Sequence, residues 1–153
     1  MTRSRVATAM SAVAVIYAAA AGVATLSPGL ARADDLNDFK TPIGDVYCQM
    51  DVLNDGAATV ACEGGGPYSG PKPDCAGHGN WGDRFYLTEG EAPSVECHTD
   101  TIRSNQPFAP ILFYGQTRTI GDITCDSELS GLTCTDTSTG RFFSMSPEAN
   151  TLG

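Results

Sequence analysis

The cysteines constrain the fold of this 153-residue chain more than any other feature. Six are present, and all of them follow the apolar N-terminal region: Cys48, Cys62, Cys75, Cys97, Cys125 and Cys134. An even number of cysteines in an exported chain indicates a disulfide framework, whereas the same number in a reducing compartment suggests metal binding or catalysis. The start of the chain therefore decides how the cysteines are interpreted.

That start has the pattern of an export signal. Arg3 and Arg5 precede an apolar stretch over residues 6–26, and Ala31-Arg32-Ala33 follows it. A basic start, an apolar middle and an A-x-A site predict a Sec-type signal peptide over residues 1–33 with cleavage after Ala33. The apolar stretch is also long enough to span a bilayer, so an uncleaved anchor is the alternative. With cleavage, we expect a secreted or cell-envelope protein with no stable membrane insertion.

The charge of the remaining chain excludes one class of partner. Cleavage would remove three arginines and leave six basic residues against 18 acidic ones, a formal charge of −12. Binding to phosphate backbones needs clustered lysine and arginine, and the six basic residues here are scattered singly. We therefore expect no nucleic-acid partner. A solvated acidic surface is the simplest interpretation, and loose binding of divalent cations or attraction to a basic partner are the alternatives.

Two segments of similar sequence place four of the cysteines in hairpins. Gly44-Asp45-Val46-Tyr47-Cys48 is echoed by Gly121-Asp122-Ile123-Thr124-Cys125, and in each case a turn and a second cysteine follow. Cysteines at facing positions of a hairpin can be close enough to bridge. This predicts two local disulfides and, by elimination, a third, although six cysteines allow 15 pairings. The predicted pairs are Cys48–Cys62, Cys125–Cys134 and Cys75–Cys97.

The rest of the pattern predicts an all-β fold. Short alternating segments such as 46–52, 84–88 and 94–98 are separated by turn residues, and no segment has a sustained helical period. We expect a small antiparallel β-sandwich or barrel of about seven or eight short strands. The domain is predicted over residues 39–147, after a flexible N-terminus at 34–38 and before a C-terminal tail at 148–153. The apolar run 111–115 is predicted to be a buried strand.

A glycine-rich loop carries the first candidate site. Residues 64–83 contain seven glycines and three prolines, and loops of this length inside a compact domain are often functional. The loop ends with three candidate ligand-binding residues: Trp81 could stack on a sugar or peptide, and His78 and Asp83 could supply hydrogen bonds. Alternatively, Trp81 closes one end of the core.

A second candidate site is catalytic. His98 and Asp100 are two residues apart, so on a strand their side chains could share a face and form a base with its carboxylate. Asp83 and Glu96 are alternative carboxylates. No G-x-S-x-G motif is present, and a turn in which Asp100 bonds the backbone is the competing interpretation. The histidines have no metal-ligand spacing, so no metal site and no cofactor are predicted.

With these residues in view, the chain resembles an uncharacterised family of secreted proteins and lipoproteins from actinobacteria with six cysteines. The resemblance spans about residues 39–145. It rests on the ordered cysteines and their neighbours: Phe39, Pro42, Gly44, Trp81-Gly82, Asp100-Thr101, Tyr114-Gly115, Ser127 and Gly131. A histidine near the end of the family pattern is missing from Gly140-Arg141-Phe142, so this chain could not use it catalytically. The resemblance implies no activity.

Three functions are compatible with this sequence. The first is a secreted non-enzymatic binding or structural module whose partner is a protein or a glycan. The second is a secreted hydrolase that uses His98 and Asp100. The third is a secreted protease inhibitor that presents loop 64–83, because a rigid disulfide-framed loop can fill a protease cleft with little ordering cost.

Overall fold

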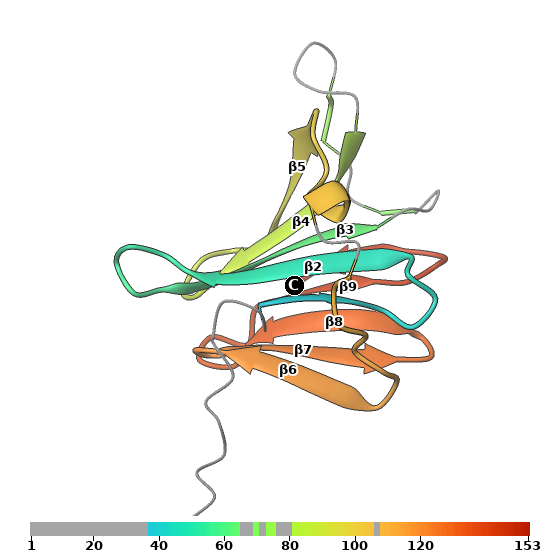
Figure 1. Cartoon of the computed structure of the whole chain (residues 1–153). Coiled ribbons are helices and arrows are strands. Elements are labelled where there is room, and N and C mark those ends of the chain that lie inside the picture. Colours follow the sequence, from blue (N-terminus) through green and yellow to red (C-terminus); the bar gives the residue numbers. More distant parts are fainter. Residues whose placement is uncertain (1–36, 65–68, 71–72, 76–80, 106–107) are drawn as a thin grey trace, which may run out of the picture.

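The computed structural model describes residues 37–64, 69–70, 73–75, 81–105 and 108–153. These residues form ten strands in two five-stranded antiparallel sheets, which lie one above the other in Figure 1. The first sheet contains β1 (Asp38–Lys40), β2 (Val46–Val52), β3 (Ala58–Gly64), β4 (Trp81–Thr88) and β5 (Ser94–His98). The second contains β6 (Gln116–Ile120), β7 (Ile123–Glu128), β8 (Gly131–Asp136), β9 (Phe142–Met145) and β10 (Asn150–Leu152).

Both sheets are meanders, because each strand pairs with the next strand along the chain. A short 3-10 helix, η2 (Ile102–Asn105), follows the first sheet, and an irregular strap over residues 108–115 leads to the second. In Figure 1 the β4–β5 hairpin rises away from the second sheet, whereas β2 and β3 lie across it. The expected all-β fold is confirmed, and it is a sandwich.

The core lies between the inner faces of the two sheets. Alternation along each strand supplies it: Val46, Cys48 and Met50 of β2 are buried, and their neighbours along the strand are more exposed. Phe85 and Phe143 come from different sheets, and their ring centroids are 5.8 Å apart. Because each fully buried side chain of this size contributes about 1.5–3 kcal/mol, this apolar layer is what holds the sheets together.

All three predicted disulfides are confirmed. Cys48 and Cys62 are direct partners in the β2–β3 ladder, with a Cα–Cα distance of 4.1 Å. Cys125 and Cys134 are direct partners in the β7–β8 ladder, with a Cα–Cα distance of 3.9 Å. The third bridge joins β5 to the glycine-rich loop: Cys75–Cys97. Each sheet therefore has its own buried clamp on its inner face.

The ends of the domain differ from the prediction. Asp38, expected in the flexible segment 34–38, lies in β1 and pairs with Gln49. The expected tail 148–153 contains β10, and Asn150 pairs with Met145 of β9. Short strands of three residues carry too little alternation to be recognised in a sequence.

The prediction of a buried strand at 111–115 is wrong. Of this run only Leu112 is buried, whereas Phe113 and Tyr114 are exposed. The segment forms the strap beside β1, where Lys40 donates to the carbonyl of Pro110 and Leu112 donates to the carbonyl of Lys40. The run therefore buries one side chain and presents aromatic side chains to solvent.

Buried and half-buried carboxylates fasten the two sheets together at one end of the sandwich. Asp136, at the end of β8, accepts hydrogen bonds from Ser138 and Thr139 of its own turn and from the backbone N–H of Gly90 in the β4–β5 turn (2.8 Å). Glu89 similarly accepts from the N–H groups of Ala58 and Asp122. Burial opposes ionisation of Asp136, but the hydrogen bonds outweigh it and hold its pKa well below the usual value.

The substitution Asp136→Asn tests this junction. A depressed pKa stabilises the fold above the unfolded-state pKa of about 4, and this stabilisation is lost as the pH falls below that value. We expect Asp136→Asn to lower the free energy of unfolding by about 2 kcal/mol near neutral pH and by less in acid. Urea unfolding across this pH range measures the difference. Asp126→Asn, on the outer face of β7, is the matched control, and a deficit of Asp136→Asn that stays constant in acid would contradict the account.

Candidate binding site

The residues predicted as catalytic belong to a buried charge cluster on the outer face of the first sheet. Alternation along β3 turns Glu63 away from the core, and residues 98–103 cover it, so that Glu63 is only 2% exposed. Its carboxylate accepts from Arg84 Nε at 2.7 Å, from Thr101 Oγ1 at 2.6 Å and from the backbone N–H of Ile102. A buried carboxylate with this many donors is a satisfied structural group.

Arg84 is the cation at the centre of this cluster. Burial opposes its charge, but hydrogen bonds with Tyr86 and Glu63 outweigh that effect and raise its pKa above the usual range. Its Nη2 atom also reaches the exposed carboxylate of Asp100 at 3.0 Å. This hydrogen bond and the positive charge of Arg84 lower the pKa of Asp100. Asp100 is therefore paired with an arginine.

His98 is held by two acceptors, and neither is the carboxylate of Asp100. Its Nε2 lies 2.6 Å from Asp83 Oδ1, and its Nδ1 contacts the backbone carbonyl of Asp100. The histidine is 8% exposed, and both ring nitrogens are occupied. A general base needs a ring nitrogen within reach of the substrate proton. The geometry of His98 therefore suits a structural role, in which its side chain joins β5 to Asp83 of β4. Glu96, the other carboxylate considered, is exposed on β5.

The residues predicted to bind a ligand are only partly brought together. The backbone of Trp81 pairs with His98 in the β4–β5 ladder, and Asp83 is bound to the imidazole of His98. His78 lies outside the described residues. Two described points fasten the glycine-rich loop: Ser69 pairs with Ala149 beside β10, and Cys75 is bonded to Cys97.

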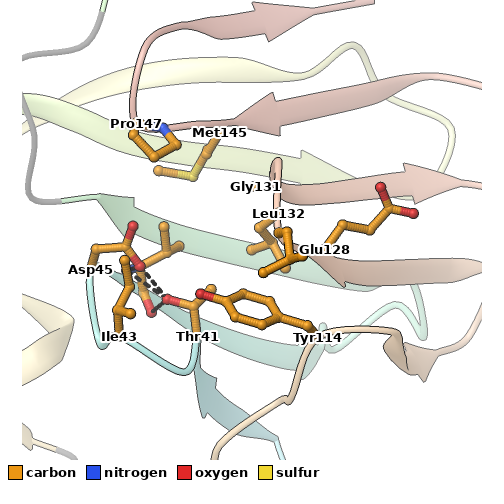
Figure 2. A pocket seen from close by; sticks show the side chains of 11 residues that line it. Thr41, Ile43, Asp45, Tyr114, Glu128, Gly131, Leu132, Met145 and Pro147 are labelled. Atoms are coloured by element: carbon orange, nitrogen blue, oxygen red, sulfur yellow. Dashed lines mark hydrogen bonds between the residues drawn. The ribbon is translucent and has the colours of Figure 1, made fainter.

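A hollow at the opposite end of the sandwich from the Asp136 junction has a different character. It lies between the β1–β2 turn, the strap, the β7–β8 turn and the segment that follows β9. Its cavity volume is about 30 Å³, which is room for about one water molecule, so the hollow is a shallow depression. Figure 2 shows the residues that line it: Thr41, Ile43, Asp45, Val46, Tyr114, Glu128, Leu129, Gly131, Leu132, Met145 and Pro147.

The floor of the hollow is apolar, and its mouth carries both apolar and charged side chains. Leu132 and Met145 of the second sheet are fully buried and form the floor. Three side chains stand at the rim: Ile43 is 71% exposed, Leu129 is 84% exposed and Tyr114 is 39% exposed. In Figure 2 the tyrosine ring lies along one side of the hollow, between Thr41 and Glu128. We call Ile43, Tyr114 and Leu129 the apolar rim.

Local backbone chemistry fixes the rim. In the β1–β2 turn, Thr41 donates its N–H to Val46, Gly44 donates its N–H to Thr41, and Asp45 accepts from Val46 at 3.0 Å. These bonds hold Ile43 at the tip of the turn. Directly after the β7–β8 turn, Gly131 begins β8 with a φ of 143°, and a Cβ there would lie 2.3 Å from the carbonyl oxygen of Met145. Only glycine allows this close approach.

Sequence reasoning missed this site. The rim residues come from three connections that are far apart in the chain, and none belongs to a recognisable motif. The one signal in the sequence was the apolar run 111–115. A buried strand accounts for such a run equally well, so the run did not point to an exposed site.

Two other kinds of feature are not found among the described residues. They contain no group of three or more histidine, cysteine, aspartate or glutamate side chains that could hold a metal ion. Within the same ranges, no helix is long and apolar enough to cross a membrane.

These features define a class of protein: a β-sandwich with a disulfide clamp in each sheet and an apolar hollow at one end. The chain belongs to the family of unknown function DUF6636, whose model matches residues 18–152. Searches of curated proteins and of solved structures found no match.

The buried charge cluster generates a stability prediction. Arg84→Met would leave the carboxylate of Glu63 buried without its cation, and we expect a loss of about 3–5 kcal/mol in the free energy of unfolding. Replacing both partners, as Arg84→Met with Glu63→Met, removes the uncompensated charge and should recover at least half of that loss. Urea unfolding of the two single variants and the double variant measures the coupling. Additive losses would show that the two groups do not depend on each other.

Proposed function

We propose that this protein is an exported, non-catalytic binding protein that recognises a polypeptide through the hollow and its apolar rim. The observation that carries the proposal is the convergence of Ile43, Tyr114 and Leu129, from three separate connections, around one opening. Exposed apolar side chains that are scattered singly are normal on protein surfaces. A group that surrounds a hollow with an apolar floor is typical of an interface, in which an aromatic residue often anchors the partner.

Export is supported by the disulfides together with the N-terminal pattern. Three bridges are formed, and no free cysteine is found among the described residues. Disulfides persist in oxidising compartments. We therefore place the protein in the medium or the cell envelope, after cleavage following Ala33.

The aliphatic part of the rim suits a polypeptide. Ile43 and Leu129 offer no hydrogen bonds, and apolar side chains of a polypeptide can pack against both, whereas a glycan could use only the polar groups at the same opening. An apolar side chain of a partner would pack at the mouth of the hollow and remove the exposed side chains of Ile43 and Leu129 from water. The same geometry does not favour the hydrolase hypothesis, because both nitrogens of His98 are engaged. The inhibitor hypothesis concerns loop 64–83, much of which lies outside the described residues.

Peptide display on the immobilised mature protein tests the proposal. We expect peptides with an apolar residue to be enriched, and we expect Leu129→Ser or Ile43→Ser to weaken their binding about fivefold or more, because buried interface anchors each contribute more than about 1 kcal/mol. Isothermal titration of the enriched peptides gives the dissociation constants.

The chain offers a matched control for the rim substitutions. Val52 and Leu53 are also exposed apolar residues, at 58% and 43%, but they lie at the β2–β3 turn, at the other end of the sandwich. Leu53→Ser should leave peptide binding unchanged. Enrichment of no peptide, or equal losses in Leu53→Ser and Leu129→Ser, would overturn the proposal, as would a glycan array that binds through the rim when no peptide does.

A further inference from the structure

The hollow also indicates the charge of the segment that it binds, an inference that rests on the proposed function. We infer that this segment is cationic: its apolar side chain packs against the apolar rim at the mouth of the hollow, and lysine or arginine residues beside it lie next to Asp45 and Glu128. Among the described residues that line the hollow, these two carboxylates are the only charged groups and none is basic. In Figure 2 they stand on opposite sides of the opening, with Tyr114 between them.

The carboxylate of Asp45 is held in place by its own turn. It accepts from the hydroxyl of Thr41 and from the backbone N–H of Val46, and both bonds end on Oδ1. Its second oxygen has no hydrogen-bond donor among the described residues. Glu128 is exposed, and within the described part of the chain it accepts from the hydroxyl of Ser130 alone, at 3.3 Å. Both groups can therefore accept from a cation without giving up a strong bond.

The cation beside Asp45 donates to backbone carbonyl groups of the turn and of β3. Arg103 donates from Nη2 to the backbone carbonyl of Asp45 at 2.7 Å and to that of Glu63 at 3.1 Å. Its guanidinium is thus engaged with carbonyl oxygens between the turn and the buried charge cluster, and it is not among the residues that line the hollow.

The tyrosine and the overall charge act in the same direction. The face of an aromatic ring attracts a lysine or arginine head group within about 6 Å, and the ring of Tyr114 lies along the opening. The acidic residues of the whole chain outnumber the basic ones by 18 to 9. A field of this sign accelerates the approach of cationic segments and repels anionic ones.

Three versions of one enriched peptide test the inference. The residues on either side of its apolar residue are made lysine, glutamine or glutamate, and the dissociation constant of each is measured by isothermal titration. We expect the lysine version to bind about two- to fivefold more tightly than the glutamine version for each carboxylate it meets, as exposed ion pairs do. The advantage should shrink as the salt concentration rises from about 20 mM to about 500 mM, because salt screens exposed charges.

A charge reversal provides the sharpest comparison. Glu128→Lys should remove most of the preference for lysine flanks and improve binding of the glutamate version. Glu91→Lys, an exposed position in the β4–β5 turn at the other end of the sandwich, makes the same change in net charge and should leave the preference nearly intact. Equal effects of the two reversals would overturn the inference, since they would reflect net charge alone.

The cationic inference and the proposed function are contradicted by different results. If rim substitutions abolish binding while the lysine, glutamine and glutamate versions bind equally, the cationic inference is wrong and the proposed function stands. If no version binds, both are wrong.

Discussion

The structure depends on two disulfides that each join directly opposed residues on the inner face of a sheet, Cys48–Cys62 in one and Cys125–Cys134 in the other. In a small sandwich, a slip of one residue between paired strands would turn every inward side chain outward. A covalent bond between facing positions excludes that slip in the central hairpin of each sheet. Both bridges are fully buried and form part of the core. The clamps thus fix which residues fill the interior and which turn residues project at the ends.

The two ends of the sandwich use that fixed register differently. At one end, Asp136 and Glu89 join turns of both sheets through hydrogen bonds, so these two carboxylates stabilise the fold. At the other end, Ile43 and Leu129 project at the tips of two turns, and the fold makes little use of them. Exposed apolar surface that contributes little to folding is the expected signature of a surface kept for association. Val52 and Leu53 are also exposed at the first end, but they are not among the residues that line the hollow, whereas Ile43 and Leu129 are. This difference is the physical basis of the proposed function.

The sequence predicted features that lie within one hairpin and missed those that distant segments form together. The hairpin disulfides could be paired because each lies across a single turn, and the third followed by elimination. The partner of His98 was expected at Asp100, two residues away, but a cross-strand neighbour, Asp83, occupies its Nε2. The run 111–115 was interpreted as a strand because a short apolar run does not reveal whether it is covered. The hollow could not be found at all, because its rim exists only after the turns of two sheets meet.

Methyl NMR of the mature protein, titrated with an enriched peptide, tests the central claim most directly. The account predicts chemical-shift changes concentrated on the methyl groups of Ile43, Leu129, Leu132 and Met145, while those of Val52 and Leu53 stay in place. Shifts concentrated at the β2–β3 turn or beside His98, with the hollow unaffected, would contradict it.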